Sequence, residues 1–207
     1  MYKGIDVSRY QGNIDYKKVK ASGIDFVIIK AGGSDAPTPY TDKFFLQNVI
    51  NAASAGLHIG AYYFVGKNCK SAEAGLYDAM RFERLLSGKV FDYPVYIDFE
   101  APDSSNKQGN TNACIAFCEY LETCGYYVGI YGSDISGFKD KLYLDQLKPY
   151  DKWVARYGSA PKYVEKWGIW QERSNGNVPG ISGHVDIDYS RNNYSDIIIK
   201  NHLNGFM

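Results

Sequence analysis

The chain has 207 residues, of which 45% are hydrophobic, so it is long enough for one large core and has the composition of a globular protein. Lysine plus arginine and aspartate plus glutamate are balanced at 23 each, which disfavours nucleic acid or an anionic membrane surface as a partner. No apolar run approaches about 18 residues, and residues 1–12 lack the apolar segment of a signal peptide. We therefore expect neither stable membrane association nor self-directed secretion.

The cysteine and histidine content leaves little room for metal or thiol chemistry. Only three histidines are present, which are few for a catalytic metal site or a Ser-His-Asp triad. The cysteines lack paired C-x-x-C spacing, so we expect reduced, partly buried thiols at Cys69, Cys114, Cys118 and Cys124. We predict no metal and no cofactor, so carboxylates remain as the candidate catalytic groups.

A unit of helix, glycine and almost wholly apolar strand recurs in the first part of the chain. It occupies residues 19–32, 51–64 and 121–132, with Gly23, Gly56 and Gly125 at the helix ends, where glycine tolerates a left-handed conformation. Strands that are apolar on both faces and separated by helices indicate a parallel sheet covered by helices.

In chain order, the pattern predicts strands at 2–8, 26–32, 58–65, 94–100, 126–132, 152–157, 167–173 and 184–189. Helices are predicted at 15–22, 43–55, 71–87 and 111–124, with Thr41 and Ser71 as N-caps. Strands after residue 150 are only about ten residues apart, so this half should be loop-rich and partly antiparallel. The predicted class is α/β: an irregular, TIM-like (β/α) barrel with mostly parallel strands, in a single domain over 1–207.

The segment PVYIDFE, residues 94–100, reads as a strand that ends in two acids. Side chains alternate along a strand, so Val95, Ile97 and Phe99 share an apolar face, whereas Asp98 and Glu100 share the other. A carboxylate is rarely buried without a partner or a task. Active sites of such barrels lie where the C-terminal ends of the strands meet, so both acids are expected to point into that mouth.

Acids on the first and last strands are expected at the same mouth. Asp6 lies late in the first strand, and Asp186 and Asp188 lie in the last, which neighbours the first in a closed barrel. Clustered carboxylates repel, so at least one should stay protonated near neutral pH, as a general acid must. Glycoside hydrolysis is the reaction that uses such a pair most directly. The spacing of the two acids along the strand does not distinguish a retaining from an inverting mechanism.

Eight segments, in this order, resemble glycoside hydrolase family 25, the lysozyme-like N-acetylmuramidases of phage endolysins and bacterial autolysins. They are GIDVSRYQGNID (4–15), FVIIKAG (26–32), GLHIGAYYF (56–64), PVYIDFE (94–100), GYYVGIYGS (125–133), WVARYG (153–158), IWQ (169–171) and GHVDID (183–188). The resemblance covers essentially the whole chain. It implies the family's irregular barrel and a peptidoglycan substrate, cut at the β-1,4 bond from N-acetylmuramic acid to N-acetylglucosamine.

Carried over by position, the resemblance implies that Glu100 is the general acid and Asp98 the second catalytic carboxylate. In this family the second carboxylate stabilises charge on the sugar or orients a 2-acetamido group that attacks within its own molecule. Asp6 and Asp186 match acids that line the subsite of the cleaved sugar. The remaining substrate-binding positions are Tyr62, Tyr131, Trp170, Lys30 and Gln171.

The chain departs from the family in three respects. The family usually has Trp at the position of Tyr16, a change compatible with packing, and commonly has Asn at the position of Asp188, where an added acid would move the pH optimum. A wall-binding module usually follows the catalytic domain, and residues 1–207 contain none, so either the sequence is truncated or targeting is done another way. We expect the catalytic domain to be monomeric. We expect the protein to stay cytoplasmic until released, as an endolysin does, or to be exported by sequence not shown.

Three rival interpretations use the same acids. A family 18 chitinase-like barrel requires the strand signature DxxDxDxE, but Tyr96 and Pro94 stand where its upstream alternation would need acids. A sugar-binding protein without activity would not need a protonatable Glu100 beside Asp98. A divalent-metal site for phosphoryl transfer would be expected with a Gly-rich phosphate loop, which the sequence lacks.

Overall fold

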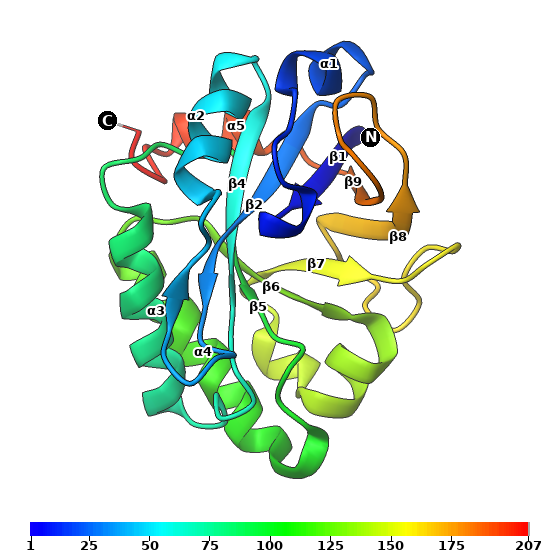
Figure 1. The fold of residues 1–207 in the computed structure, drawn as a ribbon. Coiled ribbons are helices and arrows are strands. Elements are labelled where there is room, and N and C mark those ends of the chain that lie inside the picture. Colours follow the sequence, from blue (N-terminus) through cyan, green and yellow to red (C-terminus); the bar gives the residue numbers. More distant parts are fainter. Residues whose placement is uncertain (207) are drawn as a thin grey trace.

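The computed structural model describes residues 1–206, in which a closed strand barrel is covered by helices (Figure 1). The barrel strands are β1 (Tyr2–Val7), β2 (Phe26–Gly33), β4 (His58–Phe64), β5 (Val95–Asp98), β6 (Val128–Ser133), β7 (Asp151–Ala155), β8 (Ile169–Gly176) and β9 (Val185–Ser190). Because β1 pairs with both β2 and β9, the sheet closes on itself. The predicted irregular barrel is confirmed.

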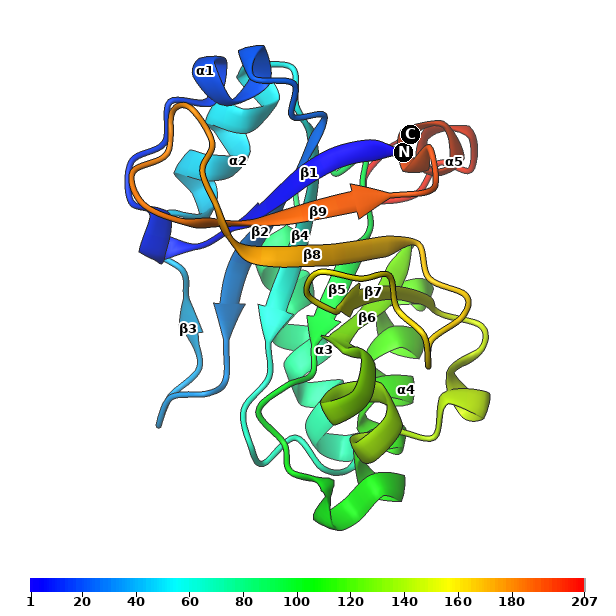
Figure 2. The ribbon, with the colours of Figure 1, turned by 90° about the vertical axis from the view of Figure 1, so that its right-hand side faces the viewer.

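Only one barrel strand runs against the others. Neighbours from β1 through β2, β4, β5, β6 and β7 to β8 are parallel, whereas β9 is antiparallel to both β8 and β1, as the opposite arrows of β1 and β9 in Figure 2 show. The expectation of antiparallel pairing in the shortened second half is therefore confirmed. A further short strand, β3 (Tyr40–Thr41), pairs with the end of β2 and was not predicted.

The helices are α1 (Tyr16–Ala21), α2 (Phe45–Ser54), α3 (Ala72–Leu86), α4 (Lys107–Thr123) and α5 (Tyr194–Lys200). Ser71 caps α3, because its side chain accepts a hydrogen bond from the backbone N–H of Ala74, as predicted. Thr41 was wrong as the cap of α2, because it is paired in β3. The N-cap is Phe44, whose backbone N–H donates a 2.9 Å hydrogen bond to the carboxylate of Asp42. Helix α4 begins four residues earlier than predicted, and α5 was not predicted.

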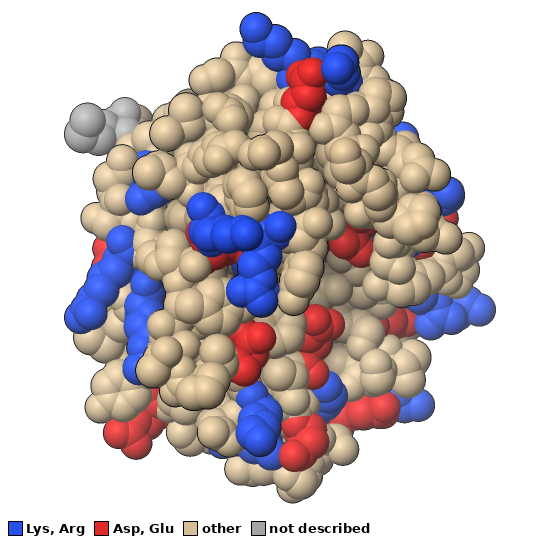
Figure 3. Space-filling view, viewed as in Figure 1, with Lys and Arg blue, Asp and Glu red and all other residues tan. Residues whose placement is uncertain are grey.

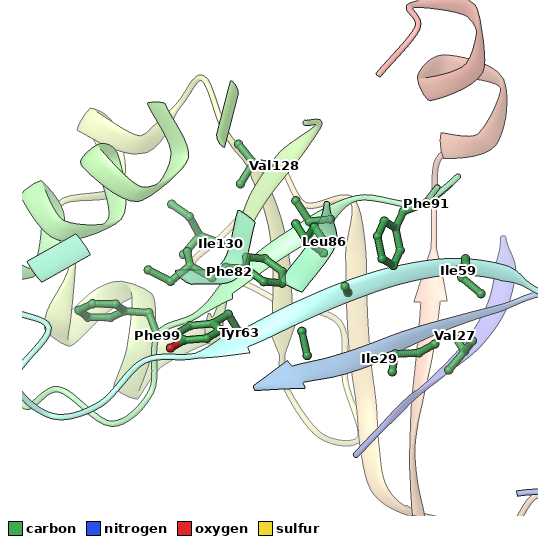
Figure 4. Close-up of a cluster of buried hydrophobic side chains, with 14 of the residues drawn as sticks. Val27, Ile29, Ile59, Tyr63, Phe82, Leu86, Phe91, Phe99, Val128 and Ile130 are labelled. Carbon is green, nitrogen blue, oxygen red and sulfur yellow. The ribbon is translucent and has the colours of Figure 1, made fainter. Parts of the chain in front are cut away.

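The main hydrophobic core lies between the barrel and its helices. Figure 4 shows part of it, where Phe82 and Leu86 of α3 pack against outward-facing side chains of the strands. Val95, Ile97 and Phe99 belong to this layer, so the predicted apolar face of PVYIDFE is the outer face of β5. Burial of a large apolar side chain of this kind stabilises the fold by about 2 kcal/mol.

A second apolar cluster fills the barrel interior and its N-terminal end. Tyr194 and Ile198 of α5 pack there with Phe26 and Tyr93, and a Cβ on Gly4 would lie only 2.3 Å from the Phe26 ring. The side chain of Asn204 donates to the carbonyl of Tyr93 over 2.9 Å, which anchors the segment after α5. The barrel is thus closed at its N-terminal end, and polar side chains meet at the C-terminal end.

The surface features agree with the composition. Figure 3 shows basic and acidic side chains interspersed on that face, as the balanced charge suggests. The cysteines are free thiols, three of them buried and Cys124 exposed, as predicted. Among residues 1–206, no helix is long and apolar enough to cross a membrane.

Candidate active site

A cavity of about 280 Å³ opens at the C-terminal end of the parallel strands. Most of its wall is acidic or aromatic, and its lining residues come from strand ends and the loops that follow them. They are Asp6, Ser8, Tyr10, Gln11, Lys30, Tyr62, Phe64, Asp98, Glu100, Tyr131, Trp153, Tyr157, Gln171 and Asp186.

Asp98 and Glu100 form one side of the cavity. Asp98 ends β5, is 4% exposed and stands level with Phe64 of β4 and Tyr131 of β6. Within the described part of the chain, its buried Oδ1 atom has no hydrogen-bond partner, and Asp98 is among the residues that line the cavity. Glu100 lies two residues further, at the exposed mouth, where its backbone carbonyl accepts a 2.6 Å hydrogen bond from Lys141 Nζ.

Asp6 and Asp186 form the opposite side. They are direct partners in the antiparallel register of β1 and β9, so both side chains point to the same face of the sheet. The Nε2 atom of Gln171 donates a 2.8 Å hydrogen bond to Asp6 Oδ2, and its Oε1 atom accepts one of 2.9 Å from the Tyr131 hydroxyl. This chain of bonds ties β1, β8 and β6 together across the cavity.

The environment of Asp98 and Glu100 favours their protonated forms. Burial raises the pKa of Asp98 well above its ordinary value, the negative charge of Glu100 raises it further, and Lys30 opposes both effects. Partial enclosure by the cavity wall raises the pKa of Glu100, while Lys141 and Lys30 lower it, although the side chain keeps contact with water. Burial thus makes both carboxyl groups harder to ionise than free ones.

The carboxyl groups on the other side are also hard to ionise. Burial raises the pKa of Asp6 well above its usual range, and the charges of Asp186 and Asp188 add to the effect, against the hydrogen bond from Gln171. Burial raises the pKa of Asp186 to about 6, with a smaller contribution from the charge of Glu100. The cavity can therefore hold protonated acids close to neutral pH, the condition for general-acid catalysis.

Aromatic rings and one lysine complete the site. The indole of Trp153 lies at the floor, with ring centroids 4.4 Å from Tyr131 and 5.8 Å from Tyr62. Lys30 Nζ is 4.3 Å from the centroid of Phe64, so the buried cation lies over an aromatic face. Rings and hydroxyls of this kind can contact both the apolar and the polar faces of a sugar.

The structure brings together eight of the nine positions named from the sequence. Those that line the cavity are Glu100, Asp98, Asp6, Asp186, Tyr62, Tyr131, Lys30 and Gln171.

Trp170 lies elsewhere, so the structure does not support its expected place around the groove. Because Gln171 points into the barrel, its neighbour on β8 points outward. Its Nε1 donates to the carbonyl of Arg156 over 2.7 Å, and its ring lies near Trp167 and Tyr189.

Sequence reasoning missed several lining residues. Tyr10 and Gln11 follow β1, and Tyr157 follows β7; both tyrosines are more than half exposed. Trp153 lies within β7 and is almost fully buried. The signal that could have found the loop residues is their place directly after barrel strands, where binding loops gather.

A barrel with paired carboxylates at its C-terminal mouth is an architecture suited to glycoside hydrolysis. Residues 5–181 match the family described as "Glycosyl hydrolases family 25". The chain therefore belongs to glycosyl hydrolase family 25.

Named relatives agree with this assignment. The chain is 33% identical over 187 residues to the autolytic lysozyme of Clostridium acetobutylicum, an alignment that covers 90% of this chain and 55% of that protein. It is 31% identical over 203 residues to Lysozyme M1 of Streptomyces globisporus, covering 89% and 66%. The solved structure of the CTP1L endolysin superposes with a TM-score of 0.82 at 28% identity, covering 96% of this chain and 69% of that one. The chain thus spans between about half and two thirds of the length of the two lysozymes.

Proposed function

We propose that the protein is a peptidoglycan hydrolase that cleaves the β-1,4 bond from N-acetylmuramic acid to N-acetylglucosamine. The observation that carries this proposal is the position of Asp98 and Glu100, which line the same cavity as Asp6 and Asp186. The names of its relatives, an autolytic lysozyme and Lysozyme M1, support the same reaction. Its place of action would then be the bacterial cell wall.

Glu100 is the proposed general acid. It lies at the mouth, where it can meet the leaving oxygen of a glycan and recover its proton from water after each turnover. Enclosure raises its pKa, which keeps the carboxyl group protonated at higher pH than a free glutamate. Lys141 donates a hydrogen bond to the backbone carbonyl of Glu100, which holds the backbone of this residue in place at the mouth.

Asp98 is the proposed second carboxylate, which supports positive charge on the sugar ring. It is buried deeper than Glu100 and has an oxygen free of protein hydrogen bonds among the described residues, so it can interact with the substrate. Lys30 favours its ionised form against the effects of burial and of Glu100. Whether Asp98 acts directly or through the 2-acetamido group of the substrate depends on the sugar's position.

Asp6, Asp186 and Gln171 would hold the sugar. The carboxyl groups of Asp6 and Asp186 offer acceptors for hydroxyl or amide groups of the ring. Gln171 uses both ends of its side chain on Asp6 and Tyr131, so it would orient these two groups.

Fragment analysis of purified peptidoglycan tests the proposal. The glycan is treated with the wild type or with Glu100→Gln, the new ends are reduced, and the fragments are identified by mass spectrometry. We expect reduced muramic acid ends from the wild type and a rate at least about 100-fold lower for Glu100→Gln. Glu73→Gln, at an exposed acid on α3, is the matched control and should keep the wild-type rate.

Three other outcomes would change the proposal. Reduced glucosamine ends would overturn the bond specificity and keep the glycosidase. Normal release by Glu100→Gln would remove Glu100 from its role, and no release from walls of several chemical types would overturn the proposed activity.

A further inference from the structure

Two carboxyl groups on the barrel strands outside the cavity, half-buried Asp151 at the start of β7 and fully buried Asp188 in β9, differ in their hydrogen bonds. Asp151 is well supplied with donors: the hydroxyls of Tyr96 and Tyr194 and the backbone N–H of Lys152 all bond to it. Asp188 in β9 is fully buried and receives one hydrogen bond, of 2.7 Å, from Trp153 Nε1 to its Oδ1 atom. Its Oδ2 atom is buried without a donor among residues 1–206.

The neighbours of Asp188 explain why this oxygen matters. On β1 the register partner of Asp188 is Gly4, which has no side chain, and Asp6 lies two residues further along β1 as the partner of Asp186. The side chains of Asp188, Asp186 and Asp6 therefore share one face of the sheet. On β8 its register partner is Gln171, whose amide already bonds to Asp6 Oδ2. On β7 the facing group is the uncharged indole of Trp153.

Two ionised carboxylates on neighbouring strands and on the same buried face would repel strongly, with little water to screen them. The charged groups that act on Asp6 are themselves acids, namely Asp186, Asp188 and Asp98, so they add to the repulsion. A proton between the two groups removes the problem. It turns Asp188 into a donor, gives Asp6 a second hydrogen bond beside that from Gln171, and leaves Asp188 Oδ1 free to accept from Trp153.

We propose that Asp188 and Asp6 share a single proton, so that Asp188 is a positioning residue that orients Asp6 and Trp153 and limits the two carboxyl groups to one negative charge. Asp188 does not line the cavity, so it acts through these two neighbours rather than on the substrate. Loss of the shared proton at higher pH puts two charges side by side, which pushes Asp6 away from its position and adds negative charge opposite Glu100.

The protonation state can be measured without turnover. Aspartate carboxyl carbons are labelled with ¹³C, and their NMR signals are followed during a pH titration of the folded wild type, Asp188→Asn and Asp103→Asn. The signal of Asp188 is identified as the one missing from Asp188→Asn. In the wild type we expect this carboxyl group to stay protonated at pH values where exposed aspartates have ionised. Asp103 is an exposed acid outside the cavity, so Asp103→Asn should leave that signal unchanged.

The variant Asp6→Asn gives a second test that does not depend on the folding of Asp188→Asn. Removing the charge of Asp6 should lower the pKa of Asp188, because the repulsion that kept Asp188 protonated is gone. An Asp188 signal that ionises together with the exposed aspartates, or that does not move in Asp6→Asn, would overturn the shared proton.

The positioning role has a kinetic test, which rests on the proposed function. Asparagine has the shape of protonated Asp188, so Asp188→Asn should stay within about threefold of the wild-type rate on the acidic side. Above the pH optimum, the rate of Asp188→Asn relative to its own maximum should be about threefold higher than that of the wild type, because the variant has no shared proton to lose. Asp188→Ala leaves Trp153 and Asp6 without this partner and should be at least about tenfold slower.

Equal losses in Asp188→Asn and Asp188→Ala with unchanged pH profiles would overturn the positioning role. The two proposals fail separately: peptidoglycan left uncut by the wild type would overturn the proposed function, whereas the shared proton would still be decided by NMR.

Discussion

The side-chain amide of Gln171 donates a 2.8 Å hydrogen bond to the carboxylate of Asp6, and so joins β8 to β1 across the candidate active site. The same side chain accepts a hydrogen bond from Tyr131, so a single neutral residue orients one acid and one aromatic ring.

Replacing this residue should affect activity more than folding. Gln171→Leu keeps the approximate volume but removes both hydrogen bonds, so Asp6 loses its orientation and turnover should fall by at least about tenfold. Release of soluble fragments from peptidoglycan measures the effect. Gln47→Leu, at an exposed glutamine on α2, is the control, and a wild-type rate for Gln171→Leu would contradict the role.

Asp186 should make stability depend on pH in the acidic range. Its pKa is raised to about 6 in the folded protein, so the protonated form favours folding; this contribution is complete below its ordinary value of 3.8 and is lost as the pH rises through about 6. Between about pH 4 and pH 7, the free energy of unfolding should fall by about 2 kcal/mol more in the wild type than in Asp186→Asn.

Urea unfolding of both proteins at the two pH values gives this difference. An equal change in the free energy of unfolding for both proteins between the two pH values would show that Asp186 titrates normally. Asp186→Asn should also lower turnover by at least about tenfold while remaining folded; a variant that is unfolded instead would make Asp186 a structural residue.

The opposite end of the barrel should respond to pH in the neutral range. His58 at the start of β4 is hydrogen bonded through Nδ1 to Asp92, which raises the pKa of the imidazole. Its stabilisation is complete below the unfolded value near 6.5 and is lost as the pH rises through the folded pKa. His58→Gln should therefore cost more stability at about pH 5 than at about pH 8.

Denaturant unfolding at both pH values measures this effect. An equal cost at both values would contradict the ion pair. The variant should retain activity, because His58 lies away from the cavity.

The packing of α3 against α4 should tolerate no added carbon at Gly75. A Cβ there would lie 2.1 Å from the carbonyl oxygen of Ala113, in the backbone of α4. Gly75→Ala should therefore force the helices apart and lower the free energy of unfolding by about 1 to 3 kcal/mol. Gly132→Ala is the control, because the nearest atom to its added Cβ would be 3.6 Å away. Equal urea midpoints for the two variants would contradict this reading of the interface.

Local patterns predicted much of the fold. The alternation in residues 94–100 assigned Val95, Ile97 and Phe99 to the outer core and Asp98 and Glu100 to the cavity, since strand geometry forces neighbouring side chains to opposite faces. The glycine that ends each helical segment marked where the following strand begins. The eight predicted strands overlap the eight that close the barrel.

Elements that depend on distant partners were harder to predict. Helix α5 is short, and it packs against Phe26 and Tyr93, far away in the sequence. The two residues of β3 are a strand only because they pair with the end of β2. That pairing also removed Thr41 from the helix end where it was expected to be the cap.

The sequence by itself determined the order of strands and helices, the face of each clear strand and the acids that end β1 and β5, because these follow from side-chain periodicity along the backbone. Only the tertiary structure decided that β9 is the antiparallel strand and that its Asp186 pairs with Asp6, that Trp170 faces outward, and that Asp188 is buried on the same face as Asp6. The physical reason is that closure of the barrel fixes the register between strands distant in sequence, and that register decides which polar groups must share one dry space.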